Sequence, residues 1–267
     1  MSLTETLARL DVQVPPFEPG HVWLAGAGPG HLAGLTLEVV AALGQADAIV
    51  YDALVDAAVL KAGPQAEAHY VGKRAGQPSA SQSFINDLIV RLAREDKRVL
   101  RLKGGDPNVF GRGGEEAAVL KAAGIPFRFL PGITSAFGAL AAAGMPATLR
   151  GVNKAIILAT GHGIDDQDHL DWASLARTGQ PIVVYMGMSN LPIIVAGLRD
   201  GGLADTTPVA VIQGATTVKE RLLISELAQV DADVRAAGIV PPALIVVGEI
   251  VRHRHALGSL MREVILP

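Results

Sequence analysis

The chain has 267 residues, of which 49% are hydrophobic and 18% charged, so it has ample material for an apolar core and is not intrinsically disordered. Its formal net charge of -3 argues against nucleic-acid binding by general basicity, and its lack of cysteine excludes disulfides, thiolate metal sites and cysteine nucleophiles. Because it has neither a secretory signal pattern nor an apolar run near the roughly 20 residues of a membrane span, we expect a cytoplasmic protein that binds no membrane.

The first 20 residues are expected to form an N-terminal extension, stiffened by prolines at 14–20. An alternation of apolar strands and amphipathic helices follows, which predicts parallel strands joined by right-handed crossovers. The expected strands are 21–25, 48–51, 69–71, 98–102 and 127–130, and the expected helices are 35–46, 83–94, 115–123 and 134–143.

A second series of elements begins near Gly151. Its expected strands are 154–159, 182–186, 209–213 and 243–247, and its expected helices are 171–177, 191–200 and 231–236. This pattern predicts an α/β protein with two α/β domains and no flexible linker. We expect the extension to cover 1–20, the N-terminal domain 21–140 and the C-terminal domain 141–267, with the boundary somewhere in 131–151.

A glycine-rich loop, Gly26-Ala27-Gly28-Pro29-Gly30, follows the first strand and precedes a helix. It matches part of a dinucleotide fingerprint, but His31 stands at the third glycine position and Pro29 lacks the N–H that a pyrophosphate would need. Asp52 ends the second strand, roughly where a ribose-binding acid would lie. Three interpretations stay open: a tight structural turn, a binding loop for another nucleotide-like ligand, and a dinucleotide site.

The segment Lys103–Gly114 has five glycines within twelve residues, directly after a strand. Its backbone is therefore expected at the carboxyl edge of a parallel sheet, where open α/β proteins bind their ligands. Asp106 and Arg112 add both signs of charge, which a purely structural loop seldom needs. Another strand-to-helix turn carries Thr134 and Ser135, whose hydroxyl groups either cap the helix or bind a polar ligand edge.

Basic residues gather between Lys73 and Arg112, where nine of them accompany four acidic residues. Those on 91–98 are expected on a solvated helix face. The loop cations are less easily explained in this way and could gather at one anionic ligand; they are Lys73, Arg74, Arg101, Lys103 and Arg112. The seven histidines form no metal set and no Gly-x-Ser-x-Gly pattern is present, so we expect neither a metal site nor a serine nucleophile.

Together these segments resemble the uroporphyrinogen-III C-methyltransferases of the tetrapyrrole methyltransferase superfamily, from about Gly20 to the C-terminus. The resemblance is carried by Gly26–Gly30, Tyr51–Val55, Val71–Gly76, Arg101–Pro107, Gly111–Glu116, Pro131–Ala136, Ala159–His162, Leu170–Ala173, Val184–Gly187 and Thr207–Ala210. Each segment alone is weak evidence for the family, but the order and spacing of the segments are specific to it. The chain departs from the family pattern where His31-Leu32 replaces Asp-Pro and Leu149-Arg150 replaces His-Arg.

The resemblance implies two α/β domains with S-adenosylmethionine bound in the cleft between them and no metal. Matched by position, the cofactor contacts are Pro29, Gly104, Gly105, Asp106, Val109, Thr134, Ser135, Met186 and Ala215. Asp52 and Lys73 match positions proposed for proton transfer, although an ordinary surface ion pair is the alternative. We also expect Arg101 near the carboxylates and ring nitrogens of the acceptor.

The reaction that the resemblance implies is C-methylation of uroporphyrinogen III to precorrin-2, in sirohaem or cobalamin formation, by a homodimer. Two alternatives stay open. The acceptor could be a later corrinoid precursor, or the chain could be a nucleotide-binding oxidoreductase built on Gly26–Gly30.

Overall fold

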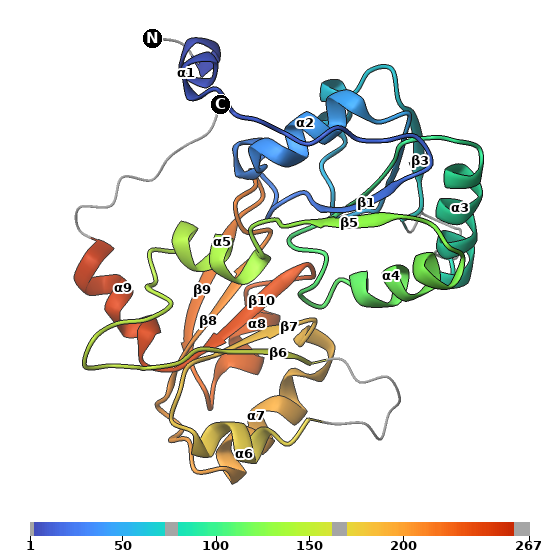
Figure 1. Ribbon diagram of the computed structural model, residues 1–267. Coiled ribbons are helices and arrows are strands. Elements are labelled where there is room, and N and C mark those ends of the chain that lie inside the picture. The colour runs from blue at the N-terminus through green and yellow to red at the C-terminus, as the bar shows by residue number, and fades with distance from the viewer. Residues whose placement is uncertain (1–2, 73–79, 162–169, 259–267) are drawn as a thin grey trace. The chain divides into compact units, whose positions relative to one another are not determined.

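A computed structural model describes residues 3–72, 80–161 and 170–258, which form two compact units (Figure 1). Unit 1 combines Met1–Gly28 with Leu32–Gly132, and unit 2 combines Ile133–Pro267 with the short segment Pro29–His31. Each unit contains a five-stranded sheet and helices, which confirms the expected mixed α/β fold. The domain ranges expected from the sequence stay a prediction.

Unit 1 is built on a fully parallel sheet with the strand order β3-β2-β4-β1-β5. Its strands are β1 (Val22–Gly26), β2 (Ala48–Tyr51), β3 (Glu67–Tyr70), β4 (Val99–Lys103) and β5 (Phe127–Leu130). β4 is the central strand and pairs with both β2 and β1. All five carboxyl ends therefore lie at one edge of the sheet, as the predicted crossovers require.

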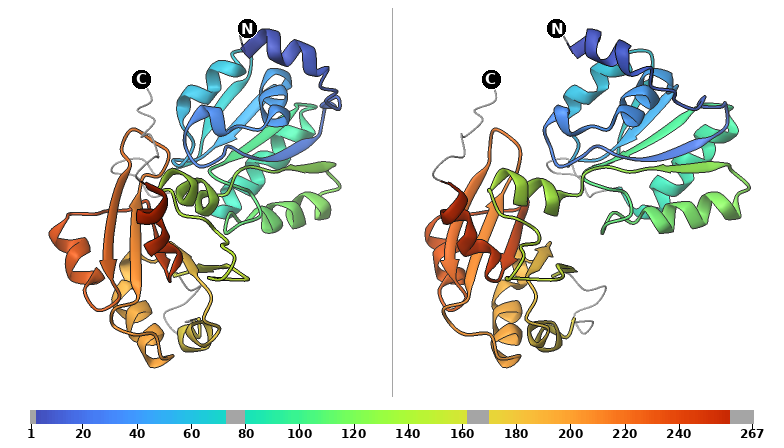
Figure 2. Two further views of the ribbon diagram at one scale, coloured as in Figure 1. Left: turned by 90° about the vertical axis from the view of Figure 1, so that its left-hand side faces the viewer. Right: turned by 60° about the vertical axis from the view of Figure 1, so that its left-hand side comes forward.

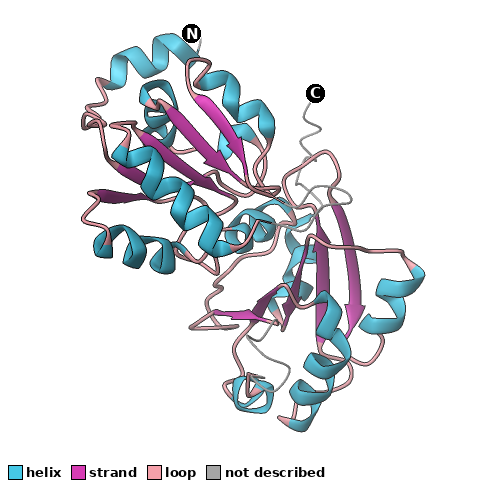
Figure 3. Ribbon diagram, turned by 90° about the vertical axis from the view of Figure 1, so that its right-hand side faces the viewer, coloured by secondary structure: helices cyan, strands magenta, loops and turns pink. Residues whose placement is uncertain are grey.

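Helices cover both faces of this sheet (Figure 3). They are α2 (Leu37–Gln45) with the 3-10 helix η2 (Ala57–Ala62) on one face, and α3 (Gln82–Arg94) with α4 (Gly113–Ala122) on the other. Unit 1 also contains α1 (Leu3–Leu10) and the 3-10 helix η1 (Leu32–Gly34). Leu100 and Leu102 of β4 pack with α2 and η2, whereas Val99 packs with α3 and α4. Because side chains alternate along a strand, Arg101 and Lys103 share the face of Val99.

Unit 2 is built on a mixed sheet with the strand order β6-β7-β10-β8-β9. Its strands are β6 (Ile157–Thr160), β7 (Ile182–Tyr185), β8 (Pro208–Gln213), β9 (Arg221–Glu226) and β10 (Ala243–Val247). β6 and β7 are parallel, whereas β10 runs antiparallel to both of its neighbours and β9 runs antiparallel to β8. The sequence analysis missed β9, because this partly exposed edge strand lacks the buried apolar run that marks the other strands.

The helices of unit 2 are α5 (Ser135–Ala142), α6 (Trp172–Arg177), α7 (Leu191–Asp200), α8 (Val230–Ala236) and α9 (Ile250–Gly258), with the 3-10 helix η3 (Met188–Asn190). α9 contacts β8 and β10 (Figure 2). The sequence analysis expected no helix after the strand 243–247, but the buried Ile250 and Val251 anchor a helix there. Its Arg254 donates from Nε to the carbonyl of Ala143, 3.0 Å away, at the end of α5.

Within the described ranges, every helix is too short or too polar to span a lipid bilayer.

Candidate functional site

Three loops meet at the carboxyl edge of the first sheet, where glycines allow them to touch. The N–H of Gly28 donates to the carbonyl of Gly105 at 3.1 Å, and the N–H of Gly105 donates back to the carbonyl of Gly28 at 2.7 Å. A Cβ at Gly26 would lie 2.5 Å from the Gly105 oxygen and 2.7 Å from Cα of Gly132. Backbone therefore packs against backbone here, so Gly26 has a structural role in the turn.

Asp106 joins two of these loops. One of its carboxylate oxygens accepts from the N–H of Asn108 at 2.8 Å, and the other accepts from the N–H of Gly132 at 3.0 Å. Later in the same loop, Phe110 and Arg112 have φ angles of 51° and 59°. A non-glycine residue in this left-handed region costs about 1 kcal/mol or more, and such strain is typical of binding loops.

Two cations of the central strand are buried on the face that α3 and α4 cover. The side chains of Arg101 and Lys103 are 3% and 6% exposed, and Glu116 of α4 is fully buried. One oxygen of Glu116, Oε1, accepts from Nε of Arg101 at 3.1 Å and from Nζ of Lys103 at 2.9 Å. Gln82 of α3 donates to the same oxygen at 3.1 Å. The carboxylate thus compensates two buried positive charges, each of which costs several kcal/mol to dehydrate.

The guanidinium of Arg101 has further partners inside the unit. One terminal nitrogen, Nη1, donates to the carbonyls of Val50 and Leu102 at 3.3 and 3.1 Å. The other terminal nitrogen, Nη2, lies 3.5 Å from Oδ2 of Asp52. The expectation that Arg101 lies near an acceptor's carboxylates stays a prediction, because the described partners of its guanidinium all belong to the protein.

Asp52 directly follows β2 and is the most accessible member of this group, with 27% of its side chain exposed. Its Oδ1 accepts from the N–H of Leu54 at 3.1 Å, which fixes the carboxylate at the carboxyl edge of the sheet. Lys73, the other predicted proton-transfer residue, lies outside the described residues. Burial lowers the pKa of Lys103 below its ordinary value of 10.5, and the charge of Arg101 lowers it further, while Glu116 opposes both.

The basic residues between Lys73 and Arg112 do not gather at one site in the described part of the chain. Lys97 and Arg98 precede β4, so they lie at its amino end and form ion pairs with carboxylates there. Arg101 and Lys103 lie near the opposite end and face Glu116. The direction of the strand therefore separates Lys97 and Arg98, which belong to the cations expected on a solvated face, from Arg101 and Lys103.

In unit 2, the two hydroxyl residues singled out from the sequence begin helix α5. Thr134 is the N-cap residue, but its side chain does not cap its own helix. Its Oγ1 lies 2.6 Å from Oη of Tyr185, the last residue of β7, and this Oη also accepts from the N–H of Ala136 at 3.0 Å. A phenol from another element therefore caps the start of α5, and Ser135 is its first helical residue.

Two other predicted cofactor contacts lie beside this helix start. A Cβ on Gly138, which is one turn into α5, would lie 2.5 Å from Cβ of Pro29. The N–H of His31 donates to Oγ1 of Thr216 at 3.4 Å, and Thr216 follows Ala215. The segment Pro29–His31 thus contacts both α5 and the loop after β8.

Met186 directly follows Tyr185 and is unusual in two ways. Its backbone is left-handed, with a φ of 52°, and 52% of this apolar residue is exposed. A buried core position would show neither property. Unit 2 therefore brings Pro29, Thr134, Ser135, Met186 and Ala215 to the neighbourhood of one helix start, although they are far apart in the sequence.

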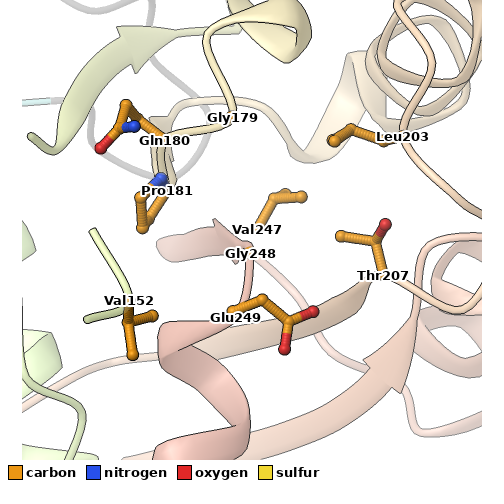
Figure 4. Close-up of a pocket in the computed structure, with 9 residues that line it drawn as sticks. All are labelled: Val152, Gly179, Gln180, Pro181, Leu203, Thr207, Val247, Gly248 and Glu249. Atoms are coloured by element: carbon orange, nitrogen blue, oxygen red, sulfur yellow. The ribbon is translucent and has the colours of Figure 1, made fainter. Parts of the chain in front are cut away.

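A hollow elsewhere in unit 2 contains none of the predicted cofactor contacts (Figure 4). Gln180, Pro181 and Glu249 are among the residues that line it. Pro181 precedes β7 and Met186 follows it, so the hollow and Met186 lie at opposite ends of the same strand. Among the described residues, no group of three or more histidine and carboxylate side chains could hold a metal ion.

The sequence analysis missed Glu116 and Tyr185, although both left a signal. Arg101 and Lys103 alternate on an otherwise apolar strand, so two cations on one buried face required a carboxylate partner. Tyr185 ends a run of valine and isoleucine, and a buried tyrosine usually finds a hydrogen-bond partner for its hydroxyl group. Each pattern predicted that a partner exists but did not identify the partner.

Glu116→Gln tests the buried network of Arg101, Lys103 and Glu116. Glu115→Gln is its control, because Glu115 is exposed and pairs with Arg112 at 2.6 Å. We expect Glu116→Gln to lower the free energy of unfolding by about 3 kcal/mol at pH 7, because two buried cations lose their counterion. Glu115→Gln should lower it by less than about 1 kcal/mol. Urea unfolding followed by circular dichroism measures both variants, and equal losses would contradict the prediction.

The decrease in the free energy of unfolding that Glu116→Gln causes should become smaller as the pH rises. The pKa of Lys103 is already lowered in the folded chain, and removal of Glu116 lowers it further. The folded chain then gives up this proton before the unfolded chain does, so the free energy of unfolding rises with pH up to about 10.5. A loss that stays constant from neutral to alkaline pH would show that the charge of Lys103 does not cause it.

Comparison with known proteins identifies the family. The family model described as Tetrapyrrole (Corrin/Porphyrin) Methylases matches residues 21–231. A uroporphyrinogen-III C-methyltransferase from Sinorhizobium sp is 49% identical over 247 residues, which are 91% of this chain and 88% of that protein. A siroheme synthase from Azotobacter vinelandii is 47% identical over 239 residues, which are 89% of this chain. The chain spans only 52% of that synthase.

A solved structure agrees with these relatives. The uroporphyrin-III C-methyltransferase from Thermus thermophilus in complex with S-adenosylhomocysteine has a TM-score of 0.74 and 38% identity, and the match covers 87% of this chain and 99% of that one. The family model covers most of the chain, and the predicted cofactor contacts, Asp52, Arg101, Glu116 and Tyr185 all lie within the matched residues. The chain therefore belongs to the tetrapyrrole (corrin/porphyrin) methylase family.

Proposed function

We propose that this chain transfers methyl groups from S-adenosylmethionine to carbon atoms of uroporphyrinogen III, giving precorrin-2. The observation that carries the proposal is the 49% identity, over nearly the whole of both chains, to a relative named uroporphyrinogen-III C-methyltransferase. Because the chain spans only about half of the siroheme synthases, the proposal is limited to the methylation step. A homodimer and a cytoplasmic location, which the family resemblance implies, are part of the same proposal.

S-adenosylmethionine supplies a methyl group that is already activated on a sulfonium. The protein therefore has to align a nucleophilic ring carbon of the acceptor with that methyl group and exclude water. The sulfur–carbon bond breaks as the new carbon–carbon bond forms, and a base must then accept a proton from the acceptor to restore its neutrality. The chain therefore needs residues that align the two substrates and one residue that acts as a base.

For the cofactor we propose contacts to the nine residues matched from the family. In unit 1 these are Gly104, Gly105, Asp106 and Val109, and in unit 2 they are Pro29, Thr134, Ser135, Met186 and Ala215. The residues present suit this ligand. Asp106 uses two of its roughly four acceptor positions for backbone N–H groups, which leaves positions for ribose hydroxyls. The half-exposed Met186 offers an apolar, polarizable surface for adenine.

For the acceptor we propose that Asp52 is the base, with Lys73 as its partner in proton transfer. Arg101 acts as a positioning residue for Asp52. Its guanidinium is held by Glu116 and by two backbone carbonyls, and its remaining nitrogen reaches Oδ2 of Asp52. The base is thereby oriented from inside the protein, while its exposed side is available to the substrate.

Arg112 is the cation of the glycine loop that can exchange its partner most easily. It pairs with Glu115, and 54% and 56% of the two side chains are exposed. An exposed pair contributes about 0–1 kcal/mol, so Arg112 can leave Glu115 for a substrate carboxylate at little cost. Arg101 has no such freedom, because its departure would leave Glu116 buried with a weaker counterion. We therefore propose Arg112, with Lys73, for recognition of the acceptor's carboxylates.

The function is tested by incubating the purified chain with S-adenosylmethionine and uroporphyrinogen III. We expect S-adenosylhomocysteine to accumulate while the acceptor gains the mass of methyl groups. Methylation of a later corrinoid precursor without turnover of uroporphyrinogen III would favour the alternative acceptor. Copurification of a nicotinamide cofactor, with no binding of S-adenosylhomocysteine, would favour the oxidoreductase instead.

Gly105→Val tests the proposed cofactor contacts in the glycine loop. Gly105 has a φ of 69°, and a β-branched side chain there strains the backbone that pairs with Gly28. We expect at least a tenfold weaker Kd for S-adenosylhomocysteine by calorimetric titration. Gly124→Val is the matched control, because Gly124 also has a φ of 69° but lies after α4 and away from the loop. Equal effects on Kd would mean that strain alone, rather than loss of a contact, explains the result.

Asp52→Asn tests the proposed base. We expect kcat to fall by about 100-fold or more, with an unchanged Kd for S-adenosylhomocysteine, because a base acts in the chemical step. Asp47→Asn is the control, since Asp47 directly precedes β2 at the opposite edge and pairs with Arg98. It should leave kcat unchanged. Full turnover by Asp52→Asn at saturating substrate would leave Asp52 only its structural role.

A further inference from the structure

The end of β7 and the start of α5 are joined by a single side chain, Tyr185. The residue is 9% exposed, and its Oη contacts two groups of the helix start. One is Oγ1 of Thr134 at 2.6 Å, and the other is the N–H of Ala136 at 3.0 Å. The next residue along β7 is the strained, half-exposed Met186.

This arrangement changes what the Thr134 hydroxyl can do. A threonine at an N-cap normally accepts a hydrogen bond from an N–H in the first turn of its own helix. Here Tyr185 accepts the N–H of Ala136, and Thr134 makes no such bond. The Thr134 hydroxyl group is instead oriented by its contact with Oη, and its remaining hydrogen-bonding positions are left for another partner.

We propose that Tyr185 is a positioning residue of the cofactor site, which orients the hydroxyl group of Thr134. This inference rests on the proposed function, because Thr134, Ser135 and Met186 are proposed cofactor contacts. Tyr185 acts through these residues and does not itself touch the cofactor. Its hydroxyl group sets the cofactor affinity by holding the contacts in place before the ligand arrives.

The test is Tyr185→Phe, which removes one oxygen and keeps the ring. We expect the Kd for S-adenosylhomocysteine to rise about five- to tenfold in calorimetric titration, as for the loss of one buried hydrogen bond. Tyr51→Phe is the control, because Tyr51 lies on β2 of unit 1 and packs against Tyr70. It should leave this Kd unchanged.

A double-mutant cycle separates positioning from simple stabilisation. Thr134→Val removes the other hydroxyl of the pair and keeps the shape of the side chain. If Tyr185 acts through Thr134, the double variant should bind S-adenosylhomocysteine within about twofold of Thr134→Val alone, and Thr134→Ser should restore the sensitivity to Tyr185→Phe. Affinity losses that multiply would overturn the proposal, because the two hydroxyls would then act independently.

Thermal unfolding gives the second readout. A purely structural tyrosine would lower the melting temperature in Tyr185→Phe and leave the Kd unchanged, and this outcome overturns the proposal while the proposed function stands. If the wild-type chain itself fails to bind S-adenosylhomocysteine, the proposed function is wrong, and the inference about Tyr185 is wrong with it. The two failures are therefore distinguished by the wild-type titration.

Discussion

Two positive charges on the central strand of a parallel sheet are the constraint on which unit 1 depends. Arg101 and Lys103 point to the same face of β4, where helices exclude water, so a carboxylate must reach both. Glu116 meets this need from the first turn of α4, and Gln82 adds a donor from α3. The position of α4 along the sheet is set by this contact, because a shift by one residue would turn Glu116 away from the cations.

The shape of the loop between β4 and α4 depends on the contact of Glu116 with Arg101 and Lys103. Its first end is fixed by the strand and its last end by Glu116, so the residues between them must close a set distance. Gly105 meets the requirement without a steric penalty, whereas Phe110 and Arg112 adopt left-handed backbone at a cost. Gly26 and Gly132 then let the neighbouring loops pack onto the Gly105 carbonyl. Strain and close packing at the carboxyl edge thus follow from the buried charges below it.

The sequence predicted the parallel sheet and the helices that cover it, because those depend on local patterns. The alternation of apolar strands with helices is visible along the chain, and so is the concentration of glycines after β4. Arg101 was expected near the acceptor's carboxylates and ring nitrogens, and no local pattern predicted its burial. Its burial depends on a carboxylate fifteen residues away, whose orientation comes from helix packing. The capping of α5 by Tyr185 spans an even larger separation and has no local signature.

Both units use the same construction, in which the carboxyl end of a strand is tied to the first turn of a helix, but the ties differ in strength. In unit 1 the tie is ionic, and to break it would leave buried charge at a cost of about 3–5 kcal/mol. In unit 2 the tie is a pair of hydrogen bonds at the hydroxyl group of Tyr185, which accepts from the N–H of Ala136, and each is worth about 1 kcal/mol. The ionic tie holds Arg101 against Asp52, the proposed base, whose position must not vary during proton transfer. The weaker tie holds in place, before the ligand binds, residues that are proposed to contact the cofactor.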